Sequence, residues 1–265
     1  MNDRLRTEGL SVRYGGNLAL DSVDVRIADG ELVGLIGPNG AGKTTFIDAL
    51  TGFTPSTGKV WVDGAELTAA KPHQRVNQGL GRTWQGAELY ADLTVRENLE
   101  VGGGSHSLFS LLREVVTGRQ SPPRAVDDVS DLLGIAAILD RQPEDLSQGQ
   151  RKSVDVGRAL AAGSRVLCLD EPAAGLDSTE SQQLGATLRQ VVADGTSLLL
   201  VDHDMGLVLS VCDRIYVLDL GRVIAEGTPD EIRSSAAVIE AYLGADDHAA
   251  TETTPAGAGA EGVER

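Results

Sequence analysis

The chain has 265 residues, of which 41% are hydrophobic and 23% charged, and its formal net charge is −16. This balance is typical of a soluble α/β protein with one large domain, or with one domain and a subdomain. The acidic excess argues against a nucleic-acid-binding protein, which would normally carry a basic stripe. Two cysteines are too few for a disulfide scaffold and fit a reducing cytosol. No apolar run has the length that spans a bilayer, so a role at a membrane would require partner proteins.

Short strands are predicted ahead of the first motif. A strand-like stretch ends at Tyr14, residues 18–27 alternate between apolar and polar side chains, and residues 29–30 form a turn into the apolar run of residues 31–36. Tyr14 comes shortly before the next motif. It could stack on a nucleotide base, or it could be an ordinary strand aromatic, and its spacing favours neither.

A glycine-rich loop follows this strand and fits the pattern G-x-x-x-x-G-K-[ST]. Its residues are Gly37, Pro38, Asn39, Gly40, Ala41, Gly42, Lys43, Thr44 and Thr45. The glycines allow backbone N–H groups to surround a phosphate, and the helix that starts near Lys43 adds its positive end. Lys43 would bind the β- and γ-phosphates, and the Thr44 hydroxyl would bind Mg²⁺. The position of the loop between a strand and a helix predicts nucleotide binding.

The pattern changes in the middle of the chain. Residues 58–64 are typical of a short strand closed by a turn, and residues 81–86 are polar and flanked by glycine. Three stretches then show helical periodicity, at residues 93–99, 108–116 and 125–139. Ser147 suits the N-cap of a further helix. Residues 93–160 are therefore predicted to form an inserted, mainly helical subdomain.

Two carboxylates follow a fully apolar strand pattern, since Asp170 and Glu171 come directly after residues 166–169. Ligands of open α/β sheets bind at the C-terminal ends of the strands. Asp170 could therefore hold Mg²⁺ through its water shell, and Glu171 could orient or deprotonate an attacking water. A second buried-strand pattern, at residues 196–201, leads to His203 at the same edge, which favours a functional histidine over a structural one.

The C-terminal part is predicted to contain a hairpin, at residues 214–218 and 222–227, and then a pair of helices that ends near residue 244. Residues 245–265 are rich in alanine, glycine, threonine and acids, with almost no apolar bulk. This composition predicts a disordered acidic tail.

In this order, the elements resemble the ATP-binding cassette (ABC) ATPase family over residues 5–244. The loop of residues 37–45 resembles Walker A. Residues 167–170 resemble Walker B, with Glu171 at the position of the catalytic carboxylate. Residues 146–150, Leu-Ser-Gln-Gly-Gln, resemble the LSGGQ signature, with a glutamine at the position where glycine is usual.

The resemblance implies roles that spacing alone does not supply. Tyr14 matches the aromatic residue that stacks on adenine, and Gln85 matches the Q-loop glutamine, implied to act in catalysis and to bind Mg²⁺. Asp177 matches the D-loop aspartate, and His203 matches the switch histidine of the catalytic site. The signature residues, implied to act on the ATP of a partner subunit, are Ser147, Gln148, Gly149 and Gln150. ATP and Mg²⁺ are the implied cofactors.

The implied fold is α/β, a P-loop NTPase core with a parallel sheet flanked by helices, an N-terminal antiparallel β subdomain and an inserted helical subdomain. The ABC ATPase domain would cover residues 1–244. Residues 5–92 and 161–244 would form its nucleotide-binding core, and residues 93–160 would form the helical subdomain with the signature motif.

Within the family, the chain is most similar to the ATPases of importers for branched-chain and other hydrophobic amino acids. The stretches that carry this similarity are residues 79–85, 93–99, 170–176, 202–205 and 227–243. Such a subunit would pair head to tail with an identical or homologous chain and would bind transmembrane permease subunits at the cytoplasmic face of the plasma (inner) membrane. It would serve an extracytoplasmic solute-binding protein indirectly. Urea and short-chain amide importers share much of the pattern, and a soluble ABC ATPase without a permease is a further alternative.

Two other classes of nucleotide-binding protein fit the sequence less well. A P-loop GTPase needs an Asn-Lys-x-Asp motif, and no Asn-Lys pair occurs in the chain. A small-molecule kinase would not need the motif of residues 147–150, or two carboxylates beside His203.

Overall fold

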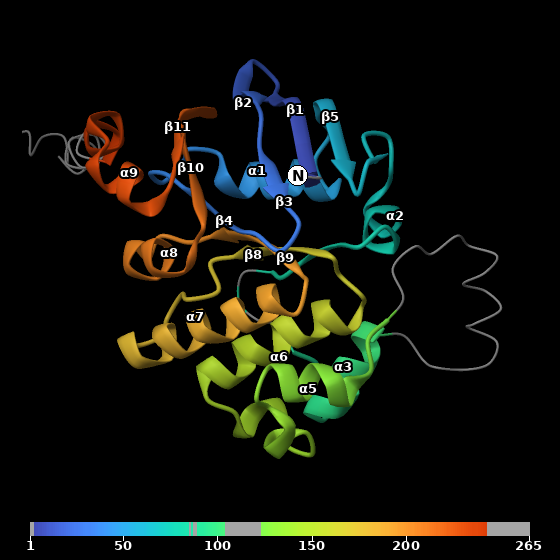
Figure 1. Ribbon diagram of the computed structural model, residues 1–265. Coiled ribbons are helices and arrows are strands. Elements are labelled where there is room, and N and C mark those ends of the chain that lie inside the picture. Colours follow the sequence, from blue (N-terminus) through green and yellow to red (C-terminus); the bar gives the residue numbers. More distant parts are fainter. Residues whose placement is uncertain (1–2, 85, 87–88, 104–122, 243–265) are drawn as a thin grey trace, which may run out of the picture.

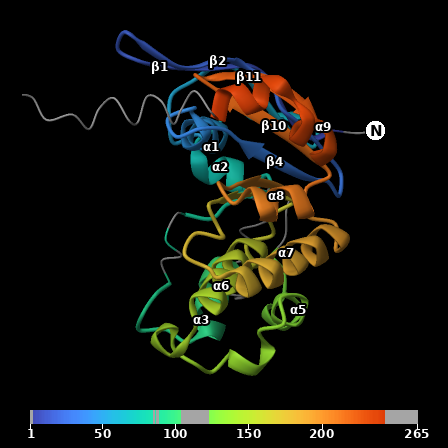
Figure 2. The same ribbon diagram turned by 90° about the vertical axis from the view of Figure 1, so that its left-hand side faces the viewer.

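Two β-sheets lie one above the other in the computed structural model, which describes residues 3–84, 86, 89–103 and 123–242 (Figure 1). Helix α1 (Lys43–Thr51) lies between the two sheets and contacts strands of both. Figure 2, turned by 90°, shows the same layers and places a group of helices at the end of the molecule away from the N-terminal strands.

The N-terminal sheet is antiparallel. Its strands are β1 (Asp3–Tyr14), β2 (Asn17–Val23), β3 (Arg26–Ala28), β5 (Thr57–Val62) and β6 (Ala65–Glu66). The predicted strand over residues 18–27 is in fact two strands. At the break between them, the Thr7 amide donates to the Val25 carbonyl oxygen (2.9 Å), and the Thr7 hydroxyl bonds two further backbone groups. It donates to the carbonyl oxygen of Val23 (3.1 Å) and accepts from the amide of Val25 (2.9 Å). The predicted end of the first strand at Tyr14 is confirmed.

The second sheet is parallel apart from one edge. Its strands, in spatial order, are β11 (Arg222–Gly227), β10 (Arg214–Asp219), β4 (Leu32–Ile36), β9 (Ser197–Val201), β8 (Val166–Asp170) and β7 (Leu80–Arg82). Only the β10–β11 hairpin, which was predicted, is antiparallel. Strand β7 was not predicted, since three residues show no periodicity. Gly81 belongs there because a Cβ atom at this position would lie 2.1 Å from Ser164 Oγ.

Alternate residues of the parallel strands face two separate cores. In β4, Val33 and Leu35 pack against α1 and the antiparallel sheet, whereas Leu32 and Ile36 face the helices on the other side. Because both faces are buried, these strands read as continuous apolar runs. Cys168 of β8 is fully buried, as predicted for a core residue, and burial raises the pKa of its thiol to about 12.

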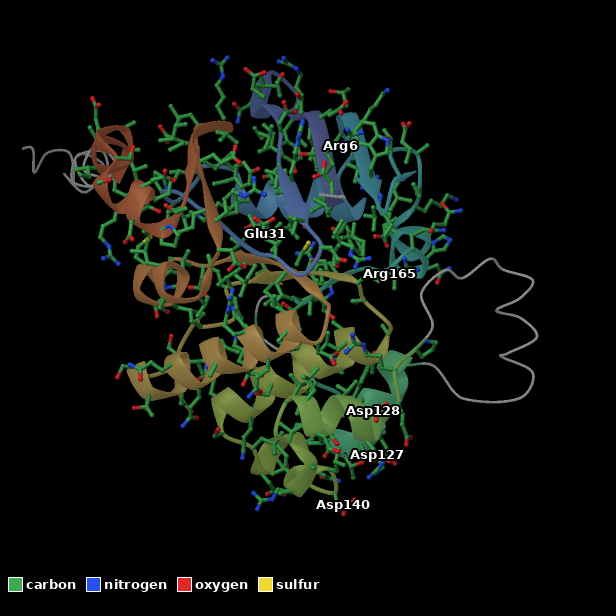
Figure 3. The ribbon with its side chains drawn as sticks, in the orientation of Figure 1. Arg6, Glu31, Asp127, Asp128, Asp140 and Arg165 are labelled. Carbon is green, nitrogen blue, oxygen red and sulfur yellow. The ribbon has the colours of Figure 1, made fainter. Side chains whose placement is uncertain are left out.

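The other helices connect the strands. They are α2 (Pro72–Asn77), α3 (Val95–Gly103), α5 (Val126–Leu132), α6 (Gln148–Ala161), α7 (Ser178–Ala193), α8 (Met205–Val211) and α9 (Pro229–Ser234). All of them except α2 contribute buried side chains to the core on the side of the parallel sheet away from α1. No helix in the described part of the chain combines the length and the apolar character needed to cross a membrane. Side chains of Asp127, Asp128 and Asp140 lie at the end of this helical group, far from Arg6 of the antiparallel sheet (Figure 3).

The predicted fold class is confirmed, whereas some helix boundaries are not. The helix predicted over residues 125–139 is divided into α5 and a 3₁₀ turn (Ala136–Ile138), because Gly134 adopts a left-handed conformation (φ +65°) between them. The helix predicted at residues 108–116 lies outside the described residues. Helices α2 and α8 were not predicted, since six and seven residues are too few for a clear period.

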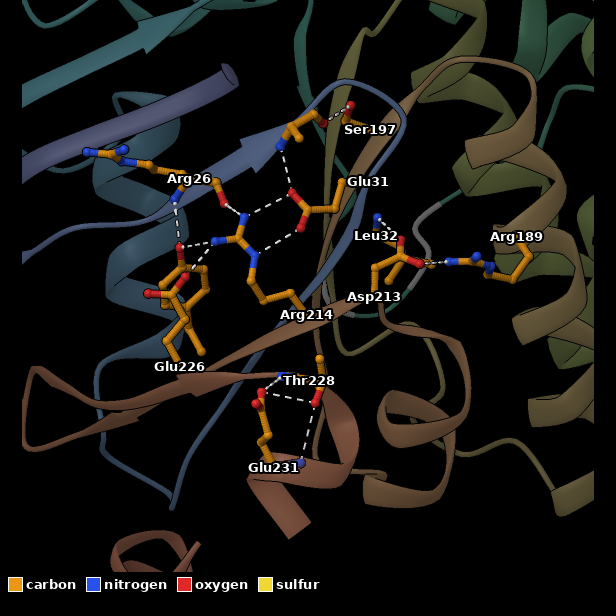
Figure 4. A network of polar contacts seen from close by, with 12 residues as sticks. Arg26, Glu31, Leu32, Arg189, Ser197, Asp213, Arg214, Glu226, Thr228 and Glu231 are labelled. Atoms are coloured by element: carbon orange, nitrogen blue, oxygen red, sulfur yellow. Dashed lines mark hydrogen bonds and ion pairs between the residues drawn. The ribbon is translucent and has the colours of Figure 1, made fainter. Parts of the chain in front are cut away.

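Arg214, at the start of β10, joins the turn before β4, strand β11 and strand β3 of the antiparallel sheet (Figure 4). Its guanidinium forms a bidentate pair with Glu31 (2.9 and 3.0 Å), and it donates to Glu226 (2.5 Å), the Tyr216 hydroxyl (3.0 Å) and the Arg26 carbonyl (2.9 Å). These hydrogen bonds, chiefly those to Glu31, raise the pKa of Arg214 against the opposing effect of burial. One side chain thus holds the turn before β4 against the β10–β11 hairpin.

We expect Arg214→Ala to lower the free energy of unfolding by about 2 kcal/mol, because it leaves partly buried charged acceptors without a donor. Urea unfolding followed by circular dichroism would measure this. Arg189→Ala is the matched control, since it removes an exposed ion pair with Asp213 (2.9 Å), and should cost less than about 1 kcal/mol. Equal effects of the two substitutions would contradict the role given to Arg214.

Candidate nucleotide-binding site

Four neighbouring parallel strands end at one edge of the sheet, and each is followed by a segment that the sequence singles out. The phosphate-loop sequence follows β4, His203 follows β9, Glu171 follows β8, and Gln85 comes shortly after β7. The registers align Leu35, Val201 and Asp170 across β4, β9 and β8. The edge thus gathers residues that lie far apart in the chain.

The phosphate-loop sequence runs between the end of β10 and the β1–β2 hairpin. Gly37 adopts φ +152°, and a Cβ atom there would lie 2.0 Å from the carbonyl oxygen of Leu218 in β10. At Gly42, with φ +106°, a Cβ atom would lie 2.9 Å from the carbonyl oxygen of Ala19 in β2. Both positions therefore require glycine for space as well as for conformation.

Lys43 lies across its own loop. Its Nζ donates hydrogen bonds to the carbonyl oxygens of Gly37 (2.7 Å) and Pro38 (3.0 Å), and the residue is 9% exposed. Burial lowers the pKa of Lys43, and the carboxylates of Glu171 and Asp170 act against this shift. The cation, the loop and both acids therefore belong to one electrostatic site. Thr44 is exposed on the first turn of α1.

The two acids after β8 have different surroundings. Asp170 is 3% exposed, and burial raises its pKa while the Arg82 guanidinium, 3.5 Å from Oδ2, opposes the rise. Glu171 turns the chain out of the sheet with a φ of +49°, which is uncommon for a residue with a side chain. Its amide donates to Val201 (2.7 Å), and its carbonyl oxygen accepts from Nζ of Lys152 (3.4 Å).

His203 is exposed, and the residue before it is not. The His203 side chain is 63% exposed, with Nδ1 3.7 Å from Oδ1 of Asp202. The Asp202 side chain is fully buried and accepts from the amides of Ala173 (2.9 Å) and Asp204 (2.9 Å). Sequence reasoning gave Asp202 no role. The only sequence signal for Asp202 was its position two residues before another acid. In the structure, its hydrogen bond from Ala173 holds the segment after Glu171 against the end of β9.

The predicted cap of α6 is confirmed. Ser147 Oγ accepts from the amide of Gln150 (3.2 Å), and the Gln150 side chain accepts from the amide of Ser147 (3.0 Å), which forms a capping box. Gln148, next in the chain, donates from Nε2 to the carbonyl oxygen of Ala174 (3.1 Å). Gln148, which stands where the signature usually has glycine, therefore contacts the segment between β8 and α7 of its own chain.

Three further predicted site residues, Asp177, Tyr14 and Gln85, belong to other segments. Asp177 is the N-cap of α7, where Oδ1 accepts from the amides of Thr179 and Glu180 (2.8 Å each). Tyr14 is 52% exposed at the end of β1, and its hydroxyl lies 3.4 Å from the Thr54 hydroxyl. An exposed ring is available for stacking, so the prediction for Tyr14 stays open. Gln85 lies outside the described residues.

A glycine-rich loop between a strand and a helix, with a lysine and two carboxylates at the same edge, defines a P-loop nucleoside triphosphatase. Comparisons with known proteins place the chain more closely. The family model described as "ABC transporter" matches residues 20–174, and the model described as "Branched-chain amino acid ATP-binding cassette transporter" matches residues 222–248.

Two curated relatives are named as high-affinity branched-chain amino acid transport ATP-binding proteins. LivG of Salmonella typhimurium is 37% identical over 248 residues, which cover 91% of this chain and 97% of LivG. BraF of Pseudomonas aeruginosa is 36% identical with the same coverage. LptB of Haemophilus influenzae, named as a lipopolysaccharide export system ATP-binding protein, is 33% identical over 91% of this chain and 97% of LptB.

Solved structures agree with this placement. A nucleotide-free ATP-binding cassette has a TM-score of 0.78 at 30% identity, covering 91% of this chain and 98% of that one. The ADP conformation of the cassette MJ1267 has the same TM-score and identity and covers 92% and 100%. The chain belongs to the ATP-binding cassette (ABC) transporter ATPase family, and it is an ATPase that binds ATP.

Lys43→Ala should weaken ATP binding by more than about tenfold, which corresponds to about 1.4 kcal/mol, because the loop loses its side-chain cation. Calorimetric titration with ATP would measure the loss. Lys59→Ala, which removes an exposed lysine beside Trp61 in the antiparallel sheet, is the control and should leave the affinity unchanged. Unchanged affinity in Lys43→Ala would refute the assignment of the loop.

Proposed function

We propose that this chain is the ATP-hydrolysing subunit of an ABC importer that takes up branched-chain amino acids through membrane permease partners. The observation that carries this proposal is the match of its C-terminal residues 222–248 to the branched-chain amino acid transporter family, which goes beyond the ATPase site common to all cassettes. The names of LivG and BraF support the same solute class. A urea or short-chain amide importer remains the alternative, as does a soluble ABC ATPase without a permease.

The chain's own residues would bind the nucleotide as follows. The backbone N–H groups of residues 37–45, which Pro38 alone lacks, and the Lys43 ammonium would hold the phosphates, and Tyr14 would stack on the adenine. The Thr44 hydroxyl and the Asp170 carboxylate are oxygen donors that suit Mg²⁺, which proteins usually bind through one or two carboxylates together with substrate phosphates. Gln85 would complete this set. When bound, Mg²⁺ would neutralise negative charge on the phosphates.

Glu171 would act as the general base for the attacking water. It follows the strand that ends in Asp170, and its electrostatic contact with Lys43 supports a position close to the γ-phosphate. His203 follows the neighbouring strand, β9, and has an exposed ring, so that it could contact the γ-phosphate from the same edge. Both side chains are proposed to assist the attack of water on the γ-phosphate, and no covalent bond to the protein forms.

Each ATP would lie between two cassettes. The N-terminus of α6, with Ser147, Gln148, Gly149 and Gln150, would face the phosphate loop of a second ATPase subunit, identical or homologous, arranged head to tail. A helix N-terminus and a serine hydroxyl would then close over the γ-phosphate from the open side. Asp177 would lie near the same interface. We propose that the dimer binds permease subunits at the cytoplasmic face of the plasma membrane, as a peripheral component.

When the dimer closes over ATP, the two proposed parts of each chain would move relative to each other. Residues 5–92 and 161–244 would act as the nucleotide-binding core, and residues 93–160 as a helical subdomain that moves with the signature motif. The proposed tail, residues 245–265, lies outside the described residues.

Glu171→Gln should trap a closed, ATP-loaded dimer. The amide keeps the shape of the side chain but cannot serve as a base, and it removes a negative charge beside the phosphate. Hydrolysis should fall by roughly 10²–10⁴-fold, the usual worth of a positioned base. Size-exclusion chromatography with ATP and Mg²⁺ should show a dimer.

The double variant Glu171→Gln with Ser147→Arg is the control for the shared site, and it should remain monomeric because the facing surface is blocked. The test should be repeated with a homologous ATPase partner if one co-purifies. ATP hydrolysis by Glu171→Gln at the parental rate would refute the catalytic role. A variant that binds ATP but stays monomeric with every partner would refute the shared site.

Arg96→Glu should reduce ATP-driven leucine uptake severalfold while leaving the ATPase rate nearly unchanged, since this surface of α3 is proposed to meet the permease. Arg96 is 40% exposed and pairs with the exposed Asp127 (3.1 Å), so the fold should tolerate the change. Glu97 is a poorer test, because it accepts from the amide and hydroxyl of Thr94 (2.8 Å each) at the start of α3. The measurement is uptake by the complex purified from its native membrane and reconstituted in vesicles.

Arg222→Glu, an exposed change in β11, is the control and should affect neither rate. A parallel fall of uptake and ATPase activity in Arg96→Glu would make the segment a folding element. The same vesicles test the solute, because uptake of urea instead of leucine would overturn the proposed substrate class. A chain that co-purifies with no membrane protein would favour the soluble alternative.

A further inference from the structure

Arg82, the last residue of β7, places its guanidinium between two carboxylates of the nucleotide site. Nη1 lies 2.6 Å from Oδ1 of Asp48 in α1, and Nη2 lies 3.5 Å from Oδ2 of Asp170 at the end of β8. The Arg82 side chain is only 7% exposed. The two nitrogens of one planar group therefore connect α1 to the acid proposed to bind Mg²⁺.

Two aromatic rings cover this guanidinium on the outside. Its carbon atom lies 4.0 Å from the ring centroid of Trp84 and 5.7 Å from that of Phe53. The two rings pack edge to face, with centroids 5.0 Å apart. Trp84 is 50% exposed and Phe53 is 52% exposed. A buried cation thus contacts an exposed aromatic pair on one side and the nucleotide site on the other.

The charges explain why a cation is needed at this point. Asp170 is buried, and it interacts electrostatically with two further acids, Glu171 and Asp48, and with two cations, Arg82 and Lys43. Without Arg82, the Asp170 carboxylate would lose a nearby positive charge and an orienting donor. The close ion pair with Asp48 fixes the position of the guanidinium. The weaker contact with Asp170 can orient that carboxylate and still leave its oxygens available to a metal ion.

We propose that Arg82 is a positioning residue for Asp170, and that it couples the orientation of this carboxylate to the exposed Trp84–Phe53 pair. The inference rests on the proposed function, in which Asp170 binds Mg²⁺. Arginine suits this role because its flat guanidinium can stack on a ring while two nitrogens bind carboxylates, which a lysine ammonium cannot do. Outer contacts of this kind orient metal ligands and typically contribute 10–100-fold to metal affinity.

The first test separates the metal from the nucleotide. ATP affinity is measured in excess EDTA, and then as a function of Mg²⁺ concentration. Arg82→Gln should leave the affinity in EDTA unchanged and should raise the Mg²⁺ concentration for half-maximal tightening by about tenfold. Arg6→Gln is the matched control, because Arg6 also stacks on a tryptophan (4.2 Å from the Trp61 ring centroid) but lies in the antiparallel sheet. It should change neither value.

The second test follows Trp84 directly. Trp61 and Trp84 are the only tryptophans of the chain, so Trp61→Phe leaves Trp84 as the sole reporter. Addition of Mg²⁺ to the ATP-bound protein should change Trp84 emission, and Arg82→Gln should abolish that change. Arg82→Lys should keep part of the Mg²⁺ dependence, because it keeps the charge, but should lose the fluorescence response, because it cannot stack.

Several outcomes would contradict the role proposed for Arg82. An Arg82→Gln protein with unchanged Mg²⁺ dependence, or with equal loss of affinity with and without Mg²⁺, would overturn the proposal. If Arg82→Gln fails to fold, Asp48→Asn removes the anchoring charge and should shift the same Mg²⁺ titration in the same direction. A parent protein whose ATP affinity does not respond to Mg²⁺ would instead refute the proposed metal site.

Discussion

The parallel register of β4, β9, β8 and β7 is the constraint on which the rest of the molecule depends. Backbone hydrogen bonds between neighbouring strands bring their C-terminal ends to one edge, and the segments that leave this edge carry the residues proposed to bind and hydrolyse the nucleotide. A one-residue shift of β8 against β9, for example, would reverse which β8 side chains face each core and would move Asp170 out of line with Val201. Burial on both faces therefore protects the geometry of the site.

The phosphate loop depends on packing from outside the motif. Gly37 lies against the Leu218 carbonyl of β10, and Gly42 lies against Ala19 of the antiparallel sheet. Arg214 holds the turn before β4 to the same β10–β11 hairpin. The loop is consequently held between elements that are distant in the sequence, and contacts within the protein itself set its shape. Such preorganisation is what strong electrostatic stabilisation of phosphate requires.

At the C-terminal edge of the parallel sheet, acidic side chains lie close to a lysine and an arginine. Asp170, Glu171 and Asp48 lie near Lys43 and Arg82, in surroundings dry enough to raise the pKa of Asp170 and lower that of Lys43. In low-dielectric surroundings, each of these charges is sensitive to its neighbours. Trp84 and Phe53, the aromatic pair that covers Arg82, are themselves about half exposed, so this group of charges lies one layer of side chains below the protein surface.

Local sequence alone determined the parts of the site that depend on short-range patterns. The loop of residues 37–45, the two acids after an apolar strand, the histidine after another, and the serine cap of α6 each need only a few consecutive residues. The α/β fold class was indicated by the composition, and its arrangement into a core and subdomains was implied by the resemblance to the ABC ATPase family. Helix ends were less predictable, because a single left-handed glycine, Gly134, divides a continuous helical pattern.

Tertiary structure decided the contacts between residues that are far apart in the chain. Arg82 meets Asp48 across 34 residues and Asp170 across 88, and Asp202 meets the amide of Ala173 across 29. No periodicity records such pairs, because strand order, and not sequence order, determines which loops become neighbours. The hydrogen bond from the Gln148 side chain to the Ala174 carbonyl oxygen is a further contact that only the tertiary structure decides. The chemical groups of the site can be read along the chain, whereas their mutual positioning exists only once the sheet has formed.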